Sequence, residues 1–225
     1  MLPIKIYWRN QVPNPAKVLI ILEELHLPYE SEWVELDALK KPPFTDVNPN
    51  GRVPAITDPN TGITLWESAA IVQYLIEEYD TQHSISYAGA PEKFHELQWL
   101  FFQASGQGPY FGQAAWFNIF HAQVYGESPE SAKIRYGAEL KRVAGVLDQV
   151  LSTRTWLVGD KCTYADLAFV PWNLQIPFVM SSREGEHAWD AEQFPHFTRW
   201  QTAMLDREAV QKVVSLIGEK HVKSA

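Results

Sequence analysis

Residues 53–68 read VPAITDPNTGITLWES, and this stretch decides the fold. Two short runs rich in β-branched residues flank the turn-forming segment 58–62, so together they predict a β-hairpin. The segment that follows, residues 67–79, repeats apolar residues at helical spacing. A strand, a tight reversal and a second strand therefore lead directly into a helix.

The residues before this hairpin predict a strand, a helix and a further strand. Residues 4–8 and 29–36 alternate as strands do, and the segment after Asn14-Pro15 has an apolar helical face. Asn14 is expected to be the N-cap of that helix, with Pro15 at its first position. Residues 1–80 thus predict an α/β domain.

Beyond residue 90 we find no convincing strand in the sequence. Residues 81–90 are small and polar and are expected to form a linker. The sequence therefore predicts an all-helical second domain over residues 91–225. Its helical patterns cover about 91–122, 129–152, 163–179 and 195–218, the last with a break near Asp206.

Composition excludes several classes of function. The net charge is −8, from 19 basic and 27 acidic residues without a Lys/Arg cluster, so we expect no nucleic-acid partner. No apolar run reaches the ~18 residues that cross a bilayer. The N-terminus lacks the apolar stretch of a signal peptide, so we expect a cytoplasmic protein without membrane partners.

Cysteine and histidine usage narrows the chemistry further. Cys162 is the single cysteine, which excludes an internal disulfide and a Cys-x-x-Cys pair, and we expect it to be buried. The seven histidines never fall at metal-ligand spacing, so no metal site is predicted.

Three local features point to one binding site. At Glu67-Ser68 a strand meets a helix, where free N–H groups attract a carboxylate and Glu67 can accept from an ammonium group. Asn14 opens another helix, and its amide can donate to an anion. Val53-Pro54 precedes a strand; a cis bond would turn the Val53 backbone toward a ligand, although the local pattern favours an ordinary trans proline. Plain helix capping explains the first two features equally simply.

Two segments carry a family resemblance that covers nearly the whole chain. Residues 48–55 (NPNGRVPA) and 66–71 (WESAAI) resemble the glutathione-site segments of cytosolic glutathione transferases. Residues 163–167 (TYADL) resemble the family's capping box, a folding element. Pro13-Asn14 and residues 99–113 are most similar to the fungal nitrogen-regulator-like and bacterial nu-class members.

The resemblance implies a thioredoxin-like domain that binds glutathione as a co-substrate, with no other cofactor. It implies that Asn14 contacts the sulfur, with Tyr7 as the alternative and Asn10 and Gln11 as further donors. For the rest of glutathione, the resemblance implies that Val53 and Pro54 contact the cysteinyl backbone. Glu67 and Ser68 are implied to bind the γ-glutamyl group, together with Gln103 across a dimer interface. Lys40 or Lys41 is implied to bind the glycyl carboxylate.

The resemblance also implies a pocket for a small hydrophobic electrophile. Its expected lining consists of six aromatic residues: Trp8, Tyr110, Phe111, Trp116, Phe117 and Phe120. Half of these six are expected to be plain core, because aromatic residues are common in cores as well as in ligand pockets.

The implied activity is a homodimeric, detoxifying transferase that stabilises the glutathione thiolate for attack on hydrophobic electrophiles. Glutathione-dependent peroxidase or disulfide-bond reductase activity is an alternative, although Val12 stands where nu-class members have a threonine linked to reduction. Pro15, where relatives have glycine, removes one helix-terminal N–H. A non-catalytic regulatory or ligand-binding protein is the third reading. In the nitrogen-regulator relatives, the regulatory activity depends on a long Asn-rich extension before the first strand. We expect no such extension here, which favours the enzyme.

Overall fold

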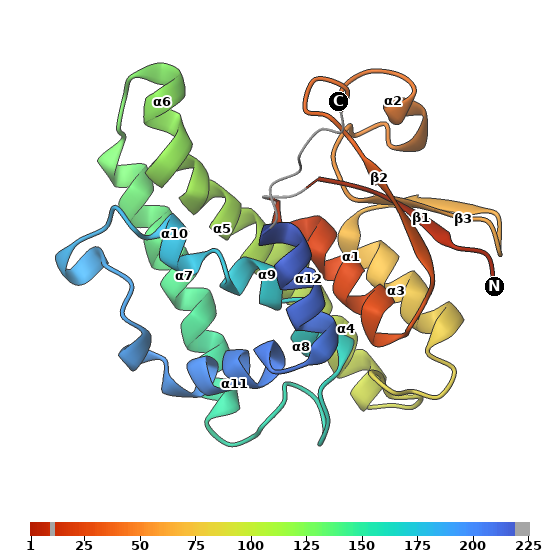
Figure 1. The fold of residues 1–225 in the computed structure, drawn as a ribbon. Helices are drawn as coiled ribbons and strands as arrows, with labels where there is room; N and C mark the ends of the chain where they lie inside the picture. The colour runs from red at the N-terminus through yellow and green to blue at the C-terminus, as the bar shows by residue number, and fades with distance from the viewer. Residues whose placement is uncertain (10–11, 219–225) are drawn as a thin grey trace. The chain divides into compact units, whose positions relative to one another are not determined.

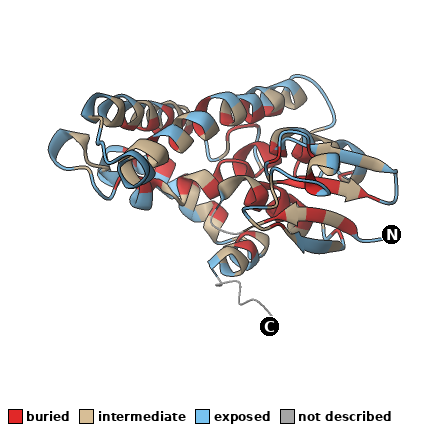
Figure 2. Ribbon diagram, turned by 90° about the horizontal axis from the view of Figure 1, so that it is seen from above, coloured by how far each residue is buried: buried red, intermediate tan, exposed pale blue. Residues whose placement is uncertain are grey.

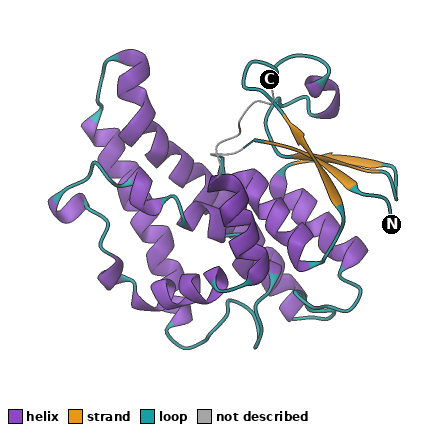
Figure 3. Cartoon of the chain, in the orientation of Figure 1, coloured by secondary structure: helices purple, strands orange, loops and turns teal. Residues whose placement is uncertain are grey.

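The computed structural model describes residues 1–9 and 12–218, and the chain divides into two compact units. The first unit combines Met1–Ala88 with the segment that begins at Asp206, and the second is Gly89–Leu205 (Figure 1). Among the described residues, strands occur in the first unit and the second is helical (Figure 3). The predicted fold class, a thioredoxin-like α/β part followed by a helical part, is confirmed.

The first unit is built on a four-stranded sheet in the order β2-β1-β3-β4. β1 pairs with β2 in parallel and with β3 antiparallel, and β3 pairs antiparallel with β4, as a hairpin requires. The strands are β1 (Ile4–Trp8), β2 (Tyr29–Trp33), β3 (Ala55–Asp58) and β4 (Ile63–Trp66).

Helices α1 (Pro13–Glu24) and α3 (Ser68–Tyr79) cover one face of this sheet, and the short α2 (Phe44–Val47) lies on the other (Figure 1). Alternation along β1 explains both layers, because Ile4 and Ile6 are fully buried whereas Tyr7 points to the α2 side. Figure 2 shows the buried residues on the inward faces of these elements.

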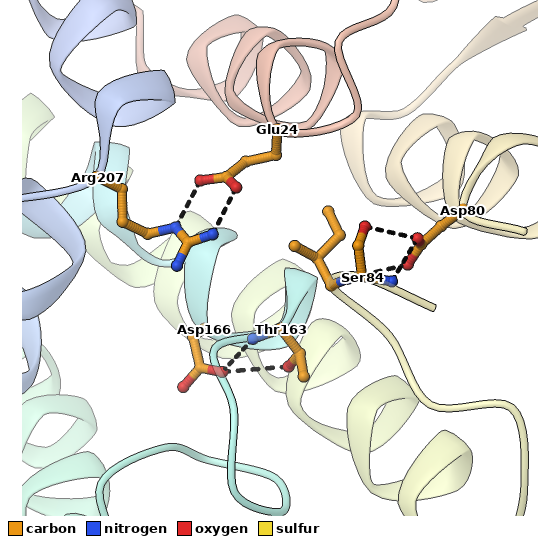
Figure 4. A network of polar contacts seen from close by, with 7 residues as sticks. Glu24, Asp80, Ser84, Thr163, Asp166 and Arg207 are labelled. Atoms are coloured by element: carbon orange, nitrogen blue, oxygen red, sulfur yellow. Dashed lines mark hydrogen bonds and ion pairs between the residues drawn. The ribbon is translucent and has the colours of Figure 1, made fainter. Parts of the chain in front are cut away.

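Helix α12 (Glu208–Gly218) belongs to the first unit, although the sequence-based boundaries count it with the helical domain. It packs against α1, and two ion pairs join them. Arg207, just before α12, donates two hydrogen bonds of 2.6 Å to Glu24 (Figure 4), and Lys212 donates one of 2.7 Å to Glu23. The break predicted near Asp206 separates α12 from α11 (Pro195–Leu205).

The regular elements of the second unit are all helical. Its segments are α4 (Glu92–Phe102), a π-helical turn (Gln103–Gln107), α5 (Gly108–Ala115), a second π-helical turn (Trp116–Phe120), α6 (His121–Tyr125), α7 (Glu130–Leu151), α8 (Tyr164–Leu167), α9 (Val170–Asn173), α10 (Ile176–Val179), 3₁₀ turns at Gly185–His187 and Ala191–Gln193, and α11 (Pro195–Leu205). No described helix is long and apolar enough to cross a bilayer.

Three local predictions are wrong in detail. The helix predicted over 163–179 is three short helices, because Pro171 and Pro177 lack the N–H that a continuous helix needs. Helix α1 starts at Pro13 with Val12 as its N-cap, so Asn14 lies in the first turn rather than before it. The Val53–Pro54 peptide bond is cis, not trans.

The capping box at Thr163 is present as predicted. Asp166 is fully buried. One oxygen of its carboxylate accepts from the backbone amide of Thr163 at 3.0 Å and from the Thr163 hydroxyl at 3.1 Å (Figure 4). Its other oxygen accepts from the Leu157 amide at 2.9 Å and the Trp200 indole at 2.8 Å. One carboxylate therefore joins the start of α8 to the preceding loop and to α11. Cys162, next to this box, is buried as expected.

A second buried carboxylate, Asp80, orders the segment that follows α3. It accepts from the amide and hydroxyl of Ser84, both at 2.7 Å, from the Ile85 amide at 3.1 Å and from the Ser86 hydroxyl at 2.7 Å (Figure 4). Burial opposes ionisation of Asp80, but hydrogen bonds from Ser86 and Ser84 outweigh it and hold its pKa below the usual value.

This contact network predicts how stability depends on pH. Because the pKa of Asp80 is lower in the folded than in the unfolded chain, its ionised form stabilises the fold above the unfolded pKa. That contribution is lost as the pH falls through the folded pKa. We expect wild type to melt above Asp80→Asn at pH 6, and the gap in melting temperature to hold to about pH 5 and then to narrow toward pH 3 as the carboxyl is protonated. A gap that stays constant over this range would contradict the assignment.

Candidate functional site

The candidate site lies at one end of the sheet in the first unit. Tyr7 of β1 pairs with Ala55 of β3, and Ala55 pairs with Trp66 of β4, so these three residues form one row across the sheet. β1 ends just beyond this row, β3 begins at it, and β4 ends at it. The segments that leave the sheet here are therefore those predicted to bind: Val53-Pro54 before β3 and Glu67-Ser68 after β4.

Two helices begin at this same end. α1 follows β1 after a short connection, α3 follows β4 directly, and the two helices pack against each other. The first turn of α3 presents N–H groups that have no partner within the helix, whereas Pro13 and Pro15 lack an N–H in the first turn of α1. Both helices point the positive end of their dipole to this end of the sheet. Asn14 lies half-buried in the first turn of α1, and Ser68 is the buried first residue of α3. The arrangement favours the binding of anions.

Glu67 has an unusual backbone conformation. Its φ is +73°, a region that side chains other than glycine rarely adopt, and its carbonyl accepts the first helical hydrogen bond from Ile71. Its side chain is exposed beside the buried Ser68. Strained residues of this kind concentrate at binding sites. A carboxylate next to a helix N-terminus matches the opposite charges of an α-amino acid group.

Val53 lies outside the hydrogen-bonded ladder. The strand begins at Ala55, and no hydrogen bond joins the Val53 backbone to another residue in the described part of the chain. Its amide and carbonyl can therefore pair with an extended peptide.

The turn that precedes Val53 is built on the buried Asn48. Its amide group donates to the Arg52 carbonyl, and its side-chain oxygen accepts from the Asn50 amide at 2.9 Å. Gly51 has a φ of +59°, and a Cβ there would lie 2.5 Å from the Leu39 carbonyl oxygen. Glycine is thus needed for this loop to close against the segment that carries the two predicted lysines.

Lys40 and Lys41 are both exposed in that segment. The Lys40 ammonium donates to the Asn50 carbonyl at 2.6 Å, which holds it beside the turn leading to Val53. The structure therefore keeps Lys40 close to the predicted site, whereas the Lys41 side chain has no hydrogen bond or ion pair to another described residue.

Tyr7, the alternative sulfur contact, lies on the α2 face of the sheet. Its ring packs against Phe44 with a centroid distance of 5.9 Å, in an apolar cluster that includes Val53. This packing gives Tyr7 a structural role that the sequence did not reveal. Asn10 and Gln11, named as further donors, lie outside the described residues.

Sequence reasoning missed Lys17 in α1. This lysine is only 3% exposed, and burial lowers its pKa to about 7 while the charge of Glu67 acts in the opposite direction. It interrupts a run of apolar residues, so its burial follows from the helix register, but its neighbour Glu67 is distant in sequence. Helical periodicity in the sequence indicates that Lys17 is buried. No pattern in the sequence indicates that Glu67 lies near it.

The predicted residues of the second unit divide into core and surface. Gln103 and Phe111 have no exposed surface: Gln103 donates to Gln107 at 2.9 Å, and Phe111 packs edge-on against Trp172. Both side chains therefore have packing roles inside the second unit, and the ligand contacts expected of them stay predictions. In the first unit Trp8 is likewise buried, with its ring edge-on to Trp33.

The other predicted aromatic residues keep exposed surface. Trp116 and Phe117 are half-buried and contact the ring of His121, and Phe120 is 43% exposed. Tyr110 is half-buried below the Arg142 guanidinium. Across residues 1–9 and 12–218 no group of three metal-ligating side chains is found.

Comparison with known proteins gives one consistent result. Residues 13–78 match the glutathione S-transferase N-terminal domain family, and residues 109–208 match the corresponding C-terminal domain family. The chain is 48% identical to the glutathione S-transferase-like protein gedE of Aspergillus terreus, with 96% of each chain covered.

Solved structures agree with the sequence comparison. Glutathione transferase URE2P6 from Phanerochaete chrysosporium, in complex with oxidized glutathione, is 44% identical with a TM-score of 0.87, covering 96% of each chain. Ure2p5 from the same fungus, cocrystallized with 1-(S-glutathionyl)-2,4-dinitrobenzene, is 39% identical with a TM-score of 0.88, covering 99% of this chain and 98% of that one.

Proposed function

Because this chain belongs to the glutathione S-transferase family of enzymes, we propose that it activates glutathione at the sheet end and transfers it to a hydrophobic electrophile. The observation that carries the proposal is the row Tyr7–Ala55–Trp66, which brings a free backbone segment, a carboxylate and two helix N-termini together. Each matches one part of a γ-glutamyl tripeptide.

The assignment of contacts follows from charge and hydrogen bonding. The γ-glutamyl ammonium pairs with Glu67, and its carboxylate accepts from Ser68 and the α3 N-terminus. The cysteinyl backbone pairs antiparallel with Val53 next to Pro54. The glycyl carboxylate lies near Lys40, with Lys41 as the second candidate. Holding the tripeptide at three points fixes its sulfur for reaction.

The thiol is activated by its surroundings. A free thiol has a pKa of ~8.5, and helix N-termini lower such values by favouring the thiolate. Asn14 lies in the first turn of α1 and adds an amide donor to this field. The thiolate then attacks the electrophile, forming a carbon–sulfur bond as the leaving group departs with its electron pair.

The half-buried and exposed aromatic side chains of the second unit supply the electrophile pocket in this proposal. Trp116, Phe117, Phe120 and Tyr110 offer flat apolar surface suited to aromatic compounds. The conjugate bound by Ure2p5 has an aromatic group of this kind. A cytoplasmic, detoxifying role is part of the same proposal.

The test of activity is direct. We expect the purified chain to form 1-(S-glutathionyl)-2,4-dinitrobenzene from glutathione and 1-chloro-2,4-dinitrobenzene, measured by absorbance. The oxidized glutathione bound by URE2P6 favours disulfide reduction as a second candidate. Turnover of a mixed glutathione disulfide without conjugation of the chloro compound would favour that activity instead.

Ser68→Ala is expected to weaken glutathione binding by ~1–3 kcal/mol, because the ligand carboxylate loses a donor in a buried position. Calorimetric titration with glutathione measures this. Ser31→Ala is the matched control, since Ser31 is exposed on β2 of the same unit. Equal affinities for wild type and Ser68→Ala would count against this half of the site.

We further propose that the enzyme is a homodimer. Phe94 and Phe101 lie two turns apart on α4, and they are 66% and 63% exposed. A second copy of the chain would cover these two apolar side chains, which lie on one helix face. Sedimentation is expected to give twice the 25.7 kDa of one chain at micromolar concentration. A particle of single-chain mass would exclude the dimer.

A further inference from the structure

Arg9, the residue that follows β1, has a guanidinium group with an unused donor. Its Nη1 nitrogen is buried and donates to no acceptor in residues 1–9 and 12–218. No ion pair joins Arg9 to a carboxylate within the same ranges. A guanidinium group keeps its charge throughout the physiological pH range. Because buried donors are normally satisfied, this one points to an acceptor that the described chain does not supply.

The ring of Trp33 holds this guanidinium group in place. The Arg9 Cζ atom lies 5.9 Å from the centroid of the ring, a distance at which a cation is attracted to the face of an indole. Trp33 is the last residue of β2, and it is paired with Trp8, the last residue of β1. A side chain held in this way loses less conformational freedom when it binds a ligand.

Arg9 lies at the same end of the sheet as the candidate site. β1 and β2 run in parallel, so their carboxyl ends coincide, and β1 leads from there to the start of α1. The positive end of the α1 dipole faces this end and already disfavours a cation. An unpaired guanidinium group added to that dipole makes this end of the sheet attractive to an anion.

The strand order separates Arg9 from the proposed contacts of glutathione's two ends. In the order β2-β1-β3-β4, the γ-glutamyl contacts follow β4, and Lys40 is bonded to the turn before β3. Arg9 lies on the other side, where β1 borders β2, and adjacent strands are about 4.8 Å apart. Asn14, the proposed sulfur contact, lies in the helix that follows β1. A group bonded to the sulfur on the β2 side would therefore meet Arg9.

We propose that Arg9 is a specificity-determining residue that selects electrophiles carrying a carboxylate. The inference rests on the proposed function and names the substrate class of the same site. A guanidinium group can donate two parallel hydrogen bonds to a carboxylate, which a neutral substituent does not match. An aromatic electrophile whose carboxylate lies opposite its leaving group can present the reacting carbon to the sulfur and the carboxylate to Arg9.

Two substrates that differ in the charge of one group test this selectivity. 4-Chloro-3,5-dinitrobenzoate and its methyl ester both lose chloride from the ring carbon to which the glutathione sulfur bonds, and absorbance follows both reactions. The readout is kcat/KM for the benzoate divided by kcat/KM for the ester, because effects on folding or on glutathione act on both substrates alike. We expect Arg9→Met to lower this ratio about tenfold, which corresponds to ~1.4 kcal/mol.

Two further variants separate the guanidinium group from charge in general. Arg9→Lys keeps the charge but not the paired donors, and we expect its ratio to lie roughly threefold above that of Arg9→Met. Lys5→Met is the matched control, because it removes one positive charge from the other end of β1. Lys5 is about 13 Å from Arg9 along the strand, beyond the screening length at physiological salt, so the ratio should stay within about twofold of wild type.

Glutathione affinity distinguishes this role from a contact with the tripeptide. We expect calorimetric titration to give Arg9→Met the wild-type affinity within about twofold, because both carboxylates of glutathione are held elsewhere in the proposal. A tenfold loss of affinity would assign Arg9 to glutathione and overturn the selectivity.

The outcomes also separate this inference from the proposed function. Conjugation of neither substrate by wild type would refute the proposed function. Conjugation of both substrates, with the same ratio in wild type and Arg9→Met, would refute this inference alone. Each variant is melted before it is assayed, and Arg9→Gln replaces Arg9→Met if the latter does not fold.

Discussion

Replacing Asp166 with alanine is expected to lower the free energy of unfolding by about 3–4 kcal/mol. The change leaves the buried amides of Leu157 and Thr163 and the buried indole of Trp200 without their acceptor. Each unsatisfied buried donor costs ~1–3 kcal/mol, and partial relaxation reduces the sum. Urea unfolding followed by circular dichroism measures the loss.

Glu127→Ala is the control for this experiment, because the Glu127 side chain is exposed in the same unit. Its effect should stay within ~0.5 kcal/mol. A loss of less than ~1 kcal/mol for Asp166→Ala would show that the capping box does not join α8 to its neighbours as strongly as the four hydrogen bonds indicate.

Asn14→Ala is expected to reduce turnover with 1-chloro-2,4-dinitrobenzene by roughly 10- to 100-fold. Loss of one donor to an oxyanion costs ~2.7–4 kcal/mol at the upper end, and the larger, more diffuse charge of sulfur makes the effect smaller. Glutathione affinity should change little, because the γ-glutamyl and glycyl ends are held elsewhere. A lower turnover with an unchanged glutathione affinity would identify a role of Asn14 at the sulfur.

Thiolate absorbance of bound glutathione, titrated against pH, gives the second measurement for Asn14. We expect the apparent pKa of the bound thiol to rise in Asn14→Ala and to stay at the wild-type value in Tyr7→Phe. The Tyr7 ring packs against Phe44 on the α2 face, which favours a structural role. The reverse result would assign the sulfur contact to Tyr7.

The sequence was most informative where structure is local. The turn 58–62, its two flanking strands and the capping box at Thr163 depend on neighbouring residues, and all of them are present. The α1 start differs from the predicted one by two residues, because Pro13, like Pro15, suits the first position of a helix. The apolar spacing over residues 163–179 continues unbroken, so it predicted one helix. Pro171 and Pro177 nevertheless divide this segment into short helices.

Contacts between distant segments could not be predicted. The row Tyr7–Ala55–Trp66 depends on strand register, which no single segment encodes, and this row unites the site. The ion pair between Glu24 and Arg207, 183 residues apart, likewise assigns α12 to the first unit.

The central claim is tested most directly by a crystal structure with glutathione bound. The account predicts the γ-glutamyl group at Glu67 and Ser68, the cysteinyl amide and carbonyl paired with Val53, and the sulfur within hydrogen-bond distance of the Asn14 amide. A tripeptide bound away from the sheet end, or a sulfur held by Tyr7 with Asn14 turned away, would contradict it.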